Sequence, residues 1–185
     1  MLSPLIAQLC NSGDYNIEIS TGNQDELCDA LLKNQIDLAI CFGNDAPHSL
    51  VQKTLITSEM CVITPPQDSN DDVISLKQLL SCDKTLIGLD NRDPLGAQLH
   101  QAIHTLEPDY HPSVSVRNYS TAAELVVHQV GCAIVDPWTA SQYKDRVHTA
   151  KLIPAIDITV SLLYAEHNPL SISARNFVQQ LEAIL

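Results

Sequence analysis

Residues 118–137 read NYSTAAELVVHQVGCAIVDP, and this stretch is the most informative part of the sequence. Apolar residues recur at helical spacing through its first half, and Ser120 stands where a helix N-cap is expected. Gly131 then permits a sharp turn into a buried apolar strand over residues 132–135. The Asp-Pro pair that follows ends this strand and can open the next helix. The pattern predicts a helix-turn-strand unit of an open α/β sheet, a kind of sheet that binds small ligands at the carboxyl ends of its strands.

A similar alternation of elements begins near the N-terminus. A short helix is predicted over residues 2–9, and residues 15–20 alternate apolar and polar side chains like a half-buried strand. Residues 23–35 predict a helix with an apolar stripe and acidic residues in its first turn. Residues 36–42 are nearly all apolar, which favours an interior parallel strand. This order predicts a strand, a right-handed crossover helix and a second strand.

The rest of the chain continues the alternation. Strands are predicted over residues 51–56, 60–64, 85–89, 114–116 and 158–164, and helices over residues 75–80, 94–106 and 171–185. Asp93 is the expected N-cap of the middle one of these helices, and Pro94 occupies its first position. Pro65 and Pro66, followed by a polar run, mark the best boundary between two lobes.

The composition is that of a globular chain without a membrane segment or a targeting signal. Hydrophobic residues make up 45% and charged residues 17% of the 185 residues, and no apolar run approaches the ~20 residues that span a bilayer. The N-terminus lacks the basic residues and cleavage site of a secretory signal, so we expect a cytoplasmic protein that does not contact membranes. The formal net charge of −12, without a basic cluster, argues against DNA binding by this chain itself.

The six cysteines and seven histidines do not form the pattern of a catalytic, metal or cofactor site. The cysteines stand singly, without a CxxC pair, which indicates buried apolar residues rather than disulfide partners. His100 and His104 are four residues apart but have no HExxH glutamate and no third ligand nearby. The sequence has no GxSxG, no phosphate loop and no GxGxxG. We therefore expect no catalytic residues, no bound metal and no cofactor.

Three segments together resemble the effector-binding, or substrate-binding, domain of LysR-type transcriptional regulators. They are residues 31–40 (LLKNQIDLAI), the stretch 118–137, and residues 168–177 (NPLSISARNF). The resemblance runs nearly from end to end of the chain. Residues 93–96 (DPLG) and 135–140 (VDPWTA) are most similar to the branch of the family that responds to amino acids and opines.

This resemblance implies an α/β chain with the two-lobed fold of type 2 periplasmic binding proteins. Residues 1–65 and 156–185 would form lobe I, and residues 66–155 would form lobe II. The two lobes would make one effector-binding domain, with a ligand cleft between them. The chain would cross from lobe to lobe near residues 64–65 and 155–158.

The resemblance also implies which residues would contact an effector. The residues are Thr64, Ser120 and Thr121, which would offer hydroxyl and N–H groups to a carboxylate, Phe42 and Gly43 as a cleft wall, Asn91 and Asp93 in a loop of lobe II, and Asp136 for an amine. A purely structural interpretation stays open for several of them. Ser120 and Thr121 could simply cap a helix, the Thr64 hydroxyl could bond to backbone, and Asp136 could cap the helix that follows it.

The sequence departs from the family pattern at two places. The resemblance implies that the chain starts inside the first helix of the domain, so we expect the first strand, a ligand loop and the N-terminal helix-turn-helix domain to be missing. Gln129 stands where the family carries glycine, and glutamine adopts a left-handed conformation less readily. Because loss of the first strand would expose a strand edge, and because the family pairs its lobes, we expect a homodimer or tetramer.

Three functions fit these observations. The first is a ligand-sensing domain that binds a small effector, amino-acid-like or another small carboxylate, and modulates transcription through a DNA-binding domain absent from this chain. DNA would then be a partner only through that absent domain. The second is a stand-alone solute-binding protein of the same fold, which would require export. The third is an enzyme on the same scaffold, since a fold does not determine a function.

Overall fold

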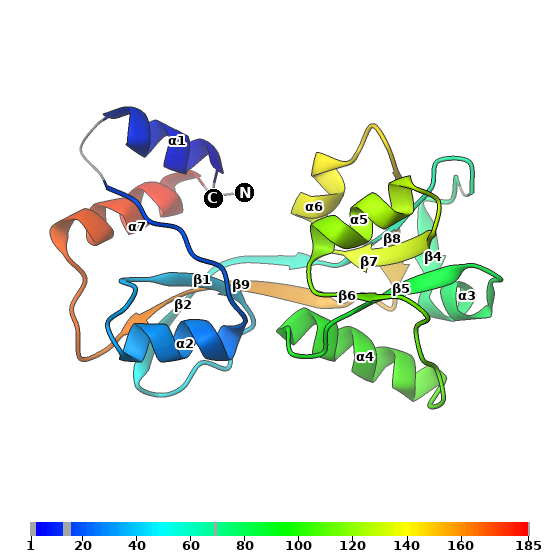
Figure 1. Cartoon of the computed structure of the whole chain (residues 1–185), viewed down its shortest axis with the longest axis horizontal. Helices are drawn as coiled ribbons and strands as arrows, with labels where there is room; N and C mark the ends of the chain where they lie inside the picture. The colour runs from blue at the N-terminus through cyan, green and yellow to red at the C-terminus, as the bar shows by residue number, and fades with distance from the viewer. Residues whose placement is uncertain (1–2, 13–15, 69, 185) are drawn as a thin grey trace. The chain divides into compact units, whose positions relative to one another are not determined.

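The structure is a computed structural model that describes residues 3–12, 16–68 and 70–184. The chain divides into two compact units, each with its own sheet (Figure 1). Unit 1 comprises Met1–Thr57 and Thr159–Leu185, and unit 2 comprises Ser58–Ile158. No helix in the described part of the chain is both long and apolar enough to cross a membrane.

Unit 1 combines a small sheet with helices. Its three-stranded sheet has the order β1-β9-β2, and β1 pairs with β9 in the antiparallel direction. The strands are β1 (Ala39–Phe42), β2 (Leu50–Glu59) and β9 (Asp157–Ala165), and the helices are α1 (Ser3–Ser12), α2 (Gln24–Leu32) and α7 (Ile172–Ile184). A capping box starts α2, because Asn23 accepts a hydrogen bond from the Glu26 N–H and Glu26 accepts one from the Asn23 N–H.

Two strand predictions for unit 1 are wrong. Residues 16–20 belong to no strand, while Tyr15 lies outside the described residues. The predicted interior parallel strand over residues 36–42 is shorter, β1 alone, and it lies at the end of its sheet antiparallel to β9. The physical reason is that an apolar pattern indicates which side chains are buried, whereas a strand also needs a hydrogen-bonding neighbour from elsewhere in the chain.

Unit 2 is built on a six-stranded sheet of order β4-β8-β3-β7-β5-β6. The strands are β3 (Cys61–Thr64), β4 (Val73–Ser75), β5 (Thr85–Leu89), β6 (Ser115–Val116), β7 (Gly131–Val135) and β8 (His148–Ile153), and the helices are α3 (Leu76–Ser81), α4 (Pro94–Leu106), α5 (Tyr119–Val127) and α6 (Pro137–Gln142). The strand β5 and the helix α4 have the predicted bounds. The strands β4 and β8, which pair with each other, were not predicted.

Strand direction gives the sheet of unit 2 two different edges. β5 runs parallel to β6 and to β7, so the carboxyl ends of these strands meet; we call this the carboxyl edge. β3 runs antiparallel to β7, with Cys61 opposite Val135. The carboxyl end of β3, at Thr64, therefore lies at the other edge, beside the amino ends of β5 and β7; we call this the amino edge.

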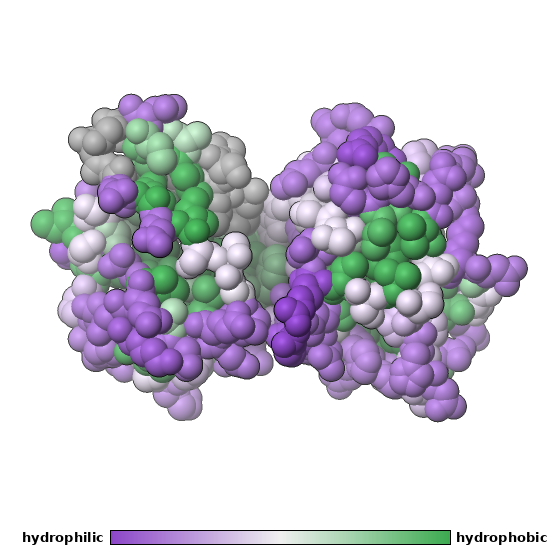
Figure 2. Space-filling model, in the orientation of Figure 1, coloured by the Kyte–Doolittle hydropathy of each residue, from purple (hydrophilic) through white to green (hydrophobic). Residues whose placement is uncertain are grey.

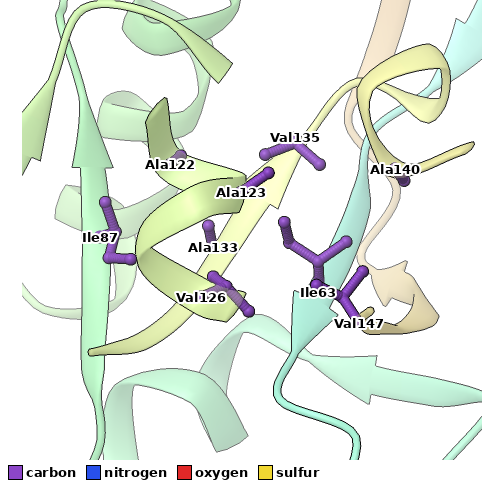
Figure 3. Close-up of a cluster of buried hydrophobic side chains, with 9 residues drawn as sticks. All are labelled: Ile63, Ile87, Ala122, Ala123, Val126, Ala133, Val135, Ala140 and Val147. Atoms are coloured by element: carbon purple, nitrogen blue, oxygen red, sulfur yellow. The ribbon is translucent and has the colours of Figure 1, made fainter. Parts of the chain in front are cut away.

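Small side chains allow α5 to lie close to the sheet of unit 2. Ala122, Ala123 and Val126 of this helix are fully buried against the strands (Figure 3). They pack with Ile63 of β3 and with neighbouring residues of β7 and β5. This contact fixes the position of α5, and hence of its N-terminus, on the sheet.

The turn between α5 and β7 differs from the prediction. Gln129, not a glycine, takes the left-handed conformation, with φ of 62°. Gly131 is required for another reason: a Cβ atom there would lie 1.9 Å from the carbonyl oxygen of Thr85. Gly131 therefore permits the close approach of β7 to β5 rather than the turn itself.

Candidate functional site

The carboxyl edge of unit 2 is the place where α4, α5 and α6 begin, and an aspartate caps two of these helices. Asp93 Oδ1 accepts hydrogen bonds from the backbone N–H groups of Leu95 (3.0 Å) and Gly96 (3.2 Å), at the start of α4. Asp136 Oδ1 accepts one from the Thr139 N–H (2.8 Å), at the start of α6. A carboxylate at a helix N-terminus offsets the positive end of the helix dipole.

The helix α5 is capped differently. The side-chain oxygen of Asn118 accepts a hydrogen bond of 2.7 Å from the Thr121 N–H, so Asn118 is the N-cap and the expectation for Ser120 is wrong. Ser120 is the second residue of the helix, because the backbone leaves its extended conformation at Asn118. An amide carries no charge. The N-terminus of α5 therefore keeps its partial positive charge, unlike those of α4 and α6.

A tyrosine joins the starts of α4 and α5. The Tyr119 hydroxyl donates a hydrogen bond to Asp93 Oδ1, the oxygen that also caps α4. Burial, followed by the charge of Asp93, raises the pKa of the Tyr119 phenol above its ordinary value. The phenol therefore stays a neutral donor. Asp93 Oδ2 has no hydrogen-bond partner among the residues that the structure describes.

Two arginines gather around Asp90 in the loop after β5. Arg92 Nη2 lies 2.6 Å from Asp90 Oδ2, and Arg117 Nε lies 3.6 Å from the same oxygen. Hydrogen bonds from Arg92 lower the pKa of Asp90 to about 2. The side chain of Arg117 is 79% exposed and directly precedes the N-cap of α5. This places an exposed guanidinium close in sequence to the uncompensated helix N-terminus.

The structure brings several of the predicted effector contacts together at the carboxyl edge. Ser120 and Thr121 are exposed in the first turn of α5, and Asn91 is exposed in the loop after β5. Asp93 is half-buried, while Asp136 is buried. Both oxygens of Asp136 are engaged, since Oδ2 accepts a hydrogen bond of 2.6 Å from the Thr139 hydroxyl. These residues share one edge because parallel strands end on the same side of a sheet.

Thr64 does not lie with these residues. It ends β3 at the amino edge, opposite His148 of β8, and is only 5% exposed. Its Oγ1 atom is buried and has no hydrogen-bond partner among the described residues. Thr64 and Ser120 therefore lie at opposite edges of this sheet, since β3 is antiparallel to β7 and its carboxyl end faces away from the edge where α5 begins.

Phe42 and Gly43 belong to unit 1, where Phe42 ends β1 and Gly43 follows it. Gly43 has φ of 99°, which favours glycine, and its N–H donates to the carbonyl of Thr159 at 2.8 Å. Its own carbonyl accepts hydrogen bonds from the Ser161 hydroxyl (2.7 Å) and from the Gln52 side chain (3.2 Å). The backbone at Gly43 is therefore held firmly within its own unit.

Sequence reasoning missed Asn118, Tyr119 and Arg117 at the carboxyl edge. Asn118 could have been found, because asparagine is as good an N-cap as serine. The contact between Tyr119 and Asp93 could not, since it joins residues that are distant in sequence. Among the described residues, no group of three or more His, Cys, Asp or Glu side chains could hold a metal ion. The edge offers hydroxyl groups, helix N–H groups and carboxylates, which suit binding of a small polar molecule.

The fold and this edge define a class of protein. Two α/β units, with polar groups at the carboxyl ends of parallel strands, are the architecture of periplasmic-binding-protein-like domains. The family model for the LysR substrate binding domain matches residues 1–185, so the chain belongs to that family. The predicted α/β fold class and the resemblance are both confirmed.

A curated relative is similar in sequence. The HTH-type transcriptional regulator DgcR of a Pseudoalteromonas species is 27% identical over 169 residues, which cover 90% of this chain and 57% of that protein. The chain thus spans little more than half the length of this relative.

Solved structures share the fold. A putative LysR family transcriptional regulator from Pseudomonas aeruginosa superposes with a TM-score of 0.80 at 19% identity, over 99% of this chain and 65% of that one. The CcmR regulatory domain of Synechocystis, in complex with 2-PG, gives a TM-score of 0.81 at 13% identity, over 99% of this chain and 92% of that one. The reduced OxyR regulatory domain from Pseudomonas aeruginosa gives 0.76 at 19% identity, over 98% and 88%.

Proposed function

We propose that this chain senses a small carboxylate, of which an amino-acid-like molecule is the best candidate, for a LysR-type transcriptional regulator. The observation that carries the proposal is the neutral cap of α5. At the carboxyl edge, Asp93 and Asp136 already supply negative charge to α4 and α6, whereas Asn118 leaves α5 without it. A bound carboxylate would supply that missing charge.

The groups around this helix end suit such an anion. The exposed hydroxyls of Ser120 and Thr121 can donate to carboxylate oxygens, as can the first N–H groups of the helix, which have no acceptor within it. The exposed guanidinium of Arg117 adds a positive charge nearby. Asn91 can contribute a side-chain amide from the neighbouring loop.

An amine on the effector fits Asp93 better than Asp136. Both oxygens of Asp136 already accept hydrogen bonds from Thr139, and the residue is buried. Asp93 Oδ2 accepts none from the described residues. A carboxylate that can still accept a hydrogen bond attracts an ammonium group strongly. We therefore assign the amine contact to Asp93.

The decisive experiment is Asn118→Asp. Aspartate caps a helix as well as asparagine does, so the variant keeps α5 but adds the charge that a ligand would supply. Amino acids and opines are screened by thermal shift, and each stabiliser is then titrated by calorimetry. The added charge should weaken binding about ten-fold or more with little change in the melting temperature of the free protein.

Three further variants test the carboxylate contact, the amine contact and a residue outside the proposed site. Ser120→Ala should weaken binding of every carboxylate, and Asp93→Asn should weaken the amino acid more than its deaminated analogue. Thr64→Val, at the amino edge, should leave affinity unchanged. The proposal would be lost if a folded protein gave no stabiliser, or if Asn118→Asp bound the stabiliser as tightly as the wild type.

Regulation would follow from a shift between conformations. An effector that binds one arrangement of the subunits more tightly than another changes their populations, and with them the spacing of DNA-binding domains. This part of the proposal requires a homodimer or tetramer, which light scattering with and without effector can measure. It also implies binding without turnover, so the effector should be recovered unchanged after prolonged incubation.

A further inference from the structure

Two histidines of α4 bring their ring nitrogens together on the surface of unit 2. His100 and His104 are four residues apart, so their side chains lie one helical turn from each other on the same side of the helix. Their Nε2 atoms are 3.2 Å apart, their ring centroids are 4.3 Å apart, and the ring planes are tilted by 55°. The spacing in the sequence permits many other ring positions, so the structure adds this convergence.

The helix that carries the pair is packed firmly on its sheet. Leu95, Leu99 and Ile103 recur every four residues, are buried, and face the sheet where α4 packs on β5. The two histidines lie beside this buried stripe, where His100 is exposed and His104 is half-buried. Figure 1 shows α4 on the face of the sheet opposite α5, and Figure 2 shows mostly hydrophilic residues over α4. A hydrated ion can therefore reach two rings that a rigid backbone holds.

The separation of the two nitrogens equals that between two ligands of one metal ion. Imidazole nitrogen binds zinc at about 2.0–2.1 Å, so two such nitrogens lie about 2.9 Å apart at a right angle and about 3.3 Å apart at a tetrahedral angle. The observed 3.2 Å lies between these values. In the hydrogen-bonded pair, one neutral ring donates its Nε2 proton to the other. When that ring carries its proton on Nδ1 instead, both Nε2 lone pairs can face an ion.

The number and type of ligands indicate which ions would bind. A third histidine, His111, meets the His104 ring edge-on, but with centroids 6.4 Å apart it stands outside the close pair. Two imidazoles leave the other positions of an ion to water. Cu²⁺ and Ni²⁺ accept such nitrogen ligands in square-planar or octahedral geometry, whereas Mg²⁺ and Ca²⁺ prefer oxygen.

We propose that His100 and His104 form a two-histidine site for a divalent late transition-metal ion, Cu²⁺ or Ni²⁺. The net charge of −12 favours the approach of a cation. A bound ion would link two successive turns of α4 and stabilise the folded chain. At 1.5 Å per residue, the pair lies roughly 10 Å or more along the helix axis from Asp93, so the proposal does not rest on the effector site.

The test titrates the untagged chain with nickel chloride, because thiols select Cu(I) and zinc, and Cys10 and Cys82 are exposed. Calorimetry should give one Ni²⁺ per chain at the tightest site, and NMR should show paramagnetic broadening centred on residues 100–104. His100→Gln and His104→Gln should each weaken this binding by about ten-fold or more, because one ligand alone loses the advantage of chelation. Glutamine is a good helix former, so α4 should persist in both variants.

The matched control is His128→Gln, which removes a 74% exposed histidine at the end of α5 and leaves the pair intact. Its affinity for Ni²⁺ should change less than about two-fold, and without metal all three variants should melt within about 2 °C of the wild type. Ni²⁺ should raise the melting temperature of the wild type and of this control, and excess EDTA should reverse the rise.

Several results would overturn the proposal. They are the absence of saturable Ni²⁺ binding, wild-type affinity in both α4 variants, and broadening centred on residues other than 100–104. An equal loss of affinity in His128→Gln and His100→Gln would also overturn it, because scattered histidines would then bind the ion singly. None of these results would change the response of Asn118→Asp to amino acids measured in EDTA, so the two proposals fail separately.

Discussion

The two edges of the sheet in unit 2 serve different purposes. At the carboxyl edge, Asp93, Asn118 and Asp136 each accept a backbone N–H and hold a helix start in place. At the amino edge, Gly131 packs against backbone and the Thr64 hydroxyl is buried without a partner among the described residues. Polar groups are therefore positioned at the carboxyl edge, while the amino edge contributes to stability through close packing.

A pair of cysteines shows which property the two edges share. Cys61 lies beside Val135 at the carboxyl edge, and Cys132 lies beside Thr85 at the amino edge. Burial raises the pKa of each thiol to about 12, with Asp136 as the next cause for Cys61 and Cys82 for Cys132. Burial therefore dominates at both edges. The edges differ in the exposure of their polar side chains, since Ser120 and Thr121 are exposed at the carboxyl edge and Thr64 is only 5% exposed at the amino edge.

The largest effect should come from Gly131→Ala at the amino edge. The new Cβ would meet the Thr85 carbonyl oxygen, which is backbone and cannot rotate away. Separating β7 from β5 should lower the free energy of unfolding by about 3 kcal/mol or more, measured by urea denaturation. Gly22→Ala is the control, because its Cβ would meet the flexible Glu26 side chain and should cost about 1 kcal/mol or less. Equal losses in the two variants would contradict this account of the amino edge.

The next largest effect should come from alkaline pH, which should lower the free energy of unfolding because the Cys132 thiol ionises more readily in the unfolded chain. The thiol is 1% exposed, and its folded-state pKa of about 12 lies above the ordinary value of 9.0. As the pH rises past 9, the unfolded chain releases this proton first, so the free energy of unfolding falls until the folded thiol also ionises near pH 12. This thiol alone should remove about 1.4 kcal/mol per pH unit in that window.

Urea denaturation of the wild type and of Cys132→Ala, at about pH 8 and about pH 10, measures this difference. The variant should lose about 1 kcal/mol less stability over the interval than the wild type. Equal losses of stability in the wild type and the variant would mean that Cys132 is not protected from ionisation in the folded state.

Thr64→Val should stabilise the chain by about 1 kcal/mol, because it replaces an unpartnered buried hydroxyl with a methyl group of similar size. Urea denaturation of the variant and of the wild type measures this gain in stability. Its affinity for any stabilising amino acid should equal that of the wild type. A loss of affinity would place Thr64 in the effector site and break the distinction between the two edges.

The smallest effect should come from Gln129→Gly. Glycine takes the left-handed conformation without a steric penalty but loses more chain entropy on folding, so the net gain should be about 0.5 kcal/mol. Asn34, with φ of 55°, provides a comparison, because asparagine tolerates this conformation better than glutamine. Asn34→Gly should therefore gain less than Gln129→Gly, and the reverse order would contradict the argument from strain.

Local signals explain which elements the sequence predicted correctly. The bounds of α4 follow from Asp93 and Pro94, which act on their own turn of backbone. The strand β5 was also predicted correctly, because Leu86, Ile87 and Leu89 form a short apolar segment. By contrast, β4 and β8 depend on pairing between distant segments, and β1 was assigned the wrong partner and direction.

The residues of the candidate site also fall into two groups, those that local sequence places correctly and one, Thr64, whose place depends on strand pairing. Ser120, Thr121, Asn91, Asp93 and Asp136 follow strands or open helices, so their patterns in the sequence place them at strand ends. Thr64 also ends a strand, and nothing in its neighbourhood indicates that this strand runs in the opposite direction. The pairing of β3 with β7 decides the matter.

The sequence alone predicts correctly that this chain is an α/β protein, that Asp93 and Asp136 cap helices, and which family it resembles. These properties depend on residues close together in the chain, where spacing and side-chain chemistry suffice. The tertiary structure alone reveals the direction of the strands, the position of Thr64 at the amino edge and the contact between Tyr119 and Asp93. Each of these is a contact, or a missing contact, between segments far apart in sequence, and local preferences cannot specify which segments meet.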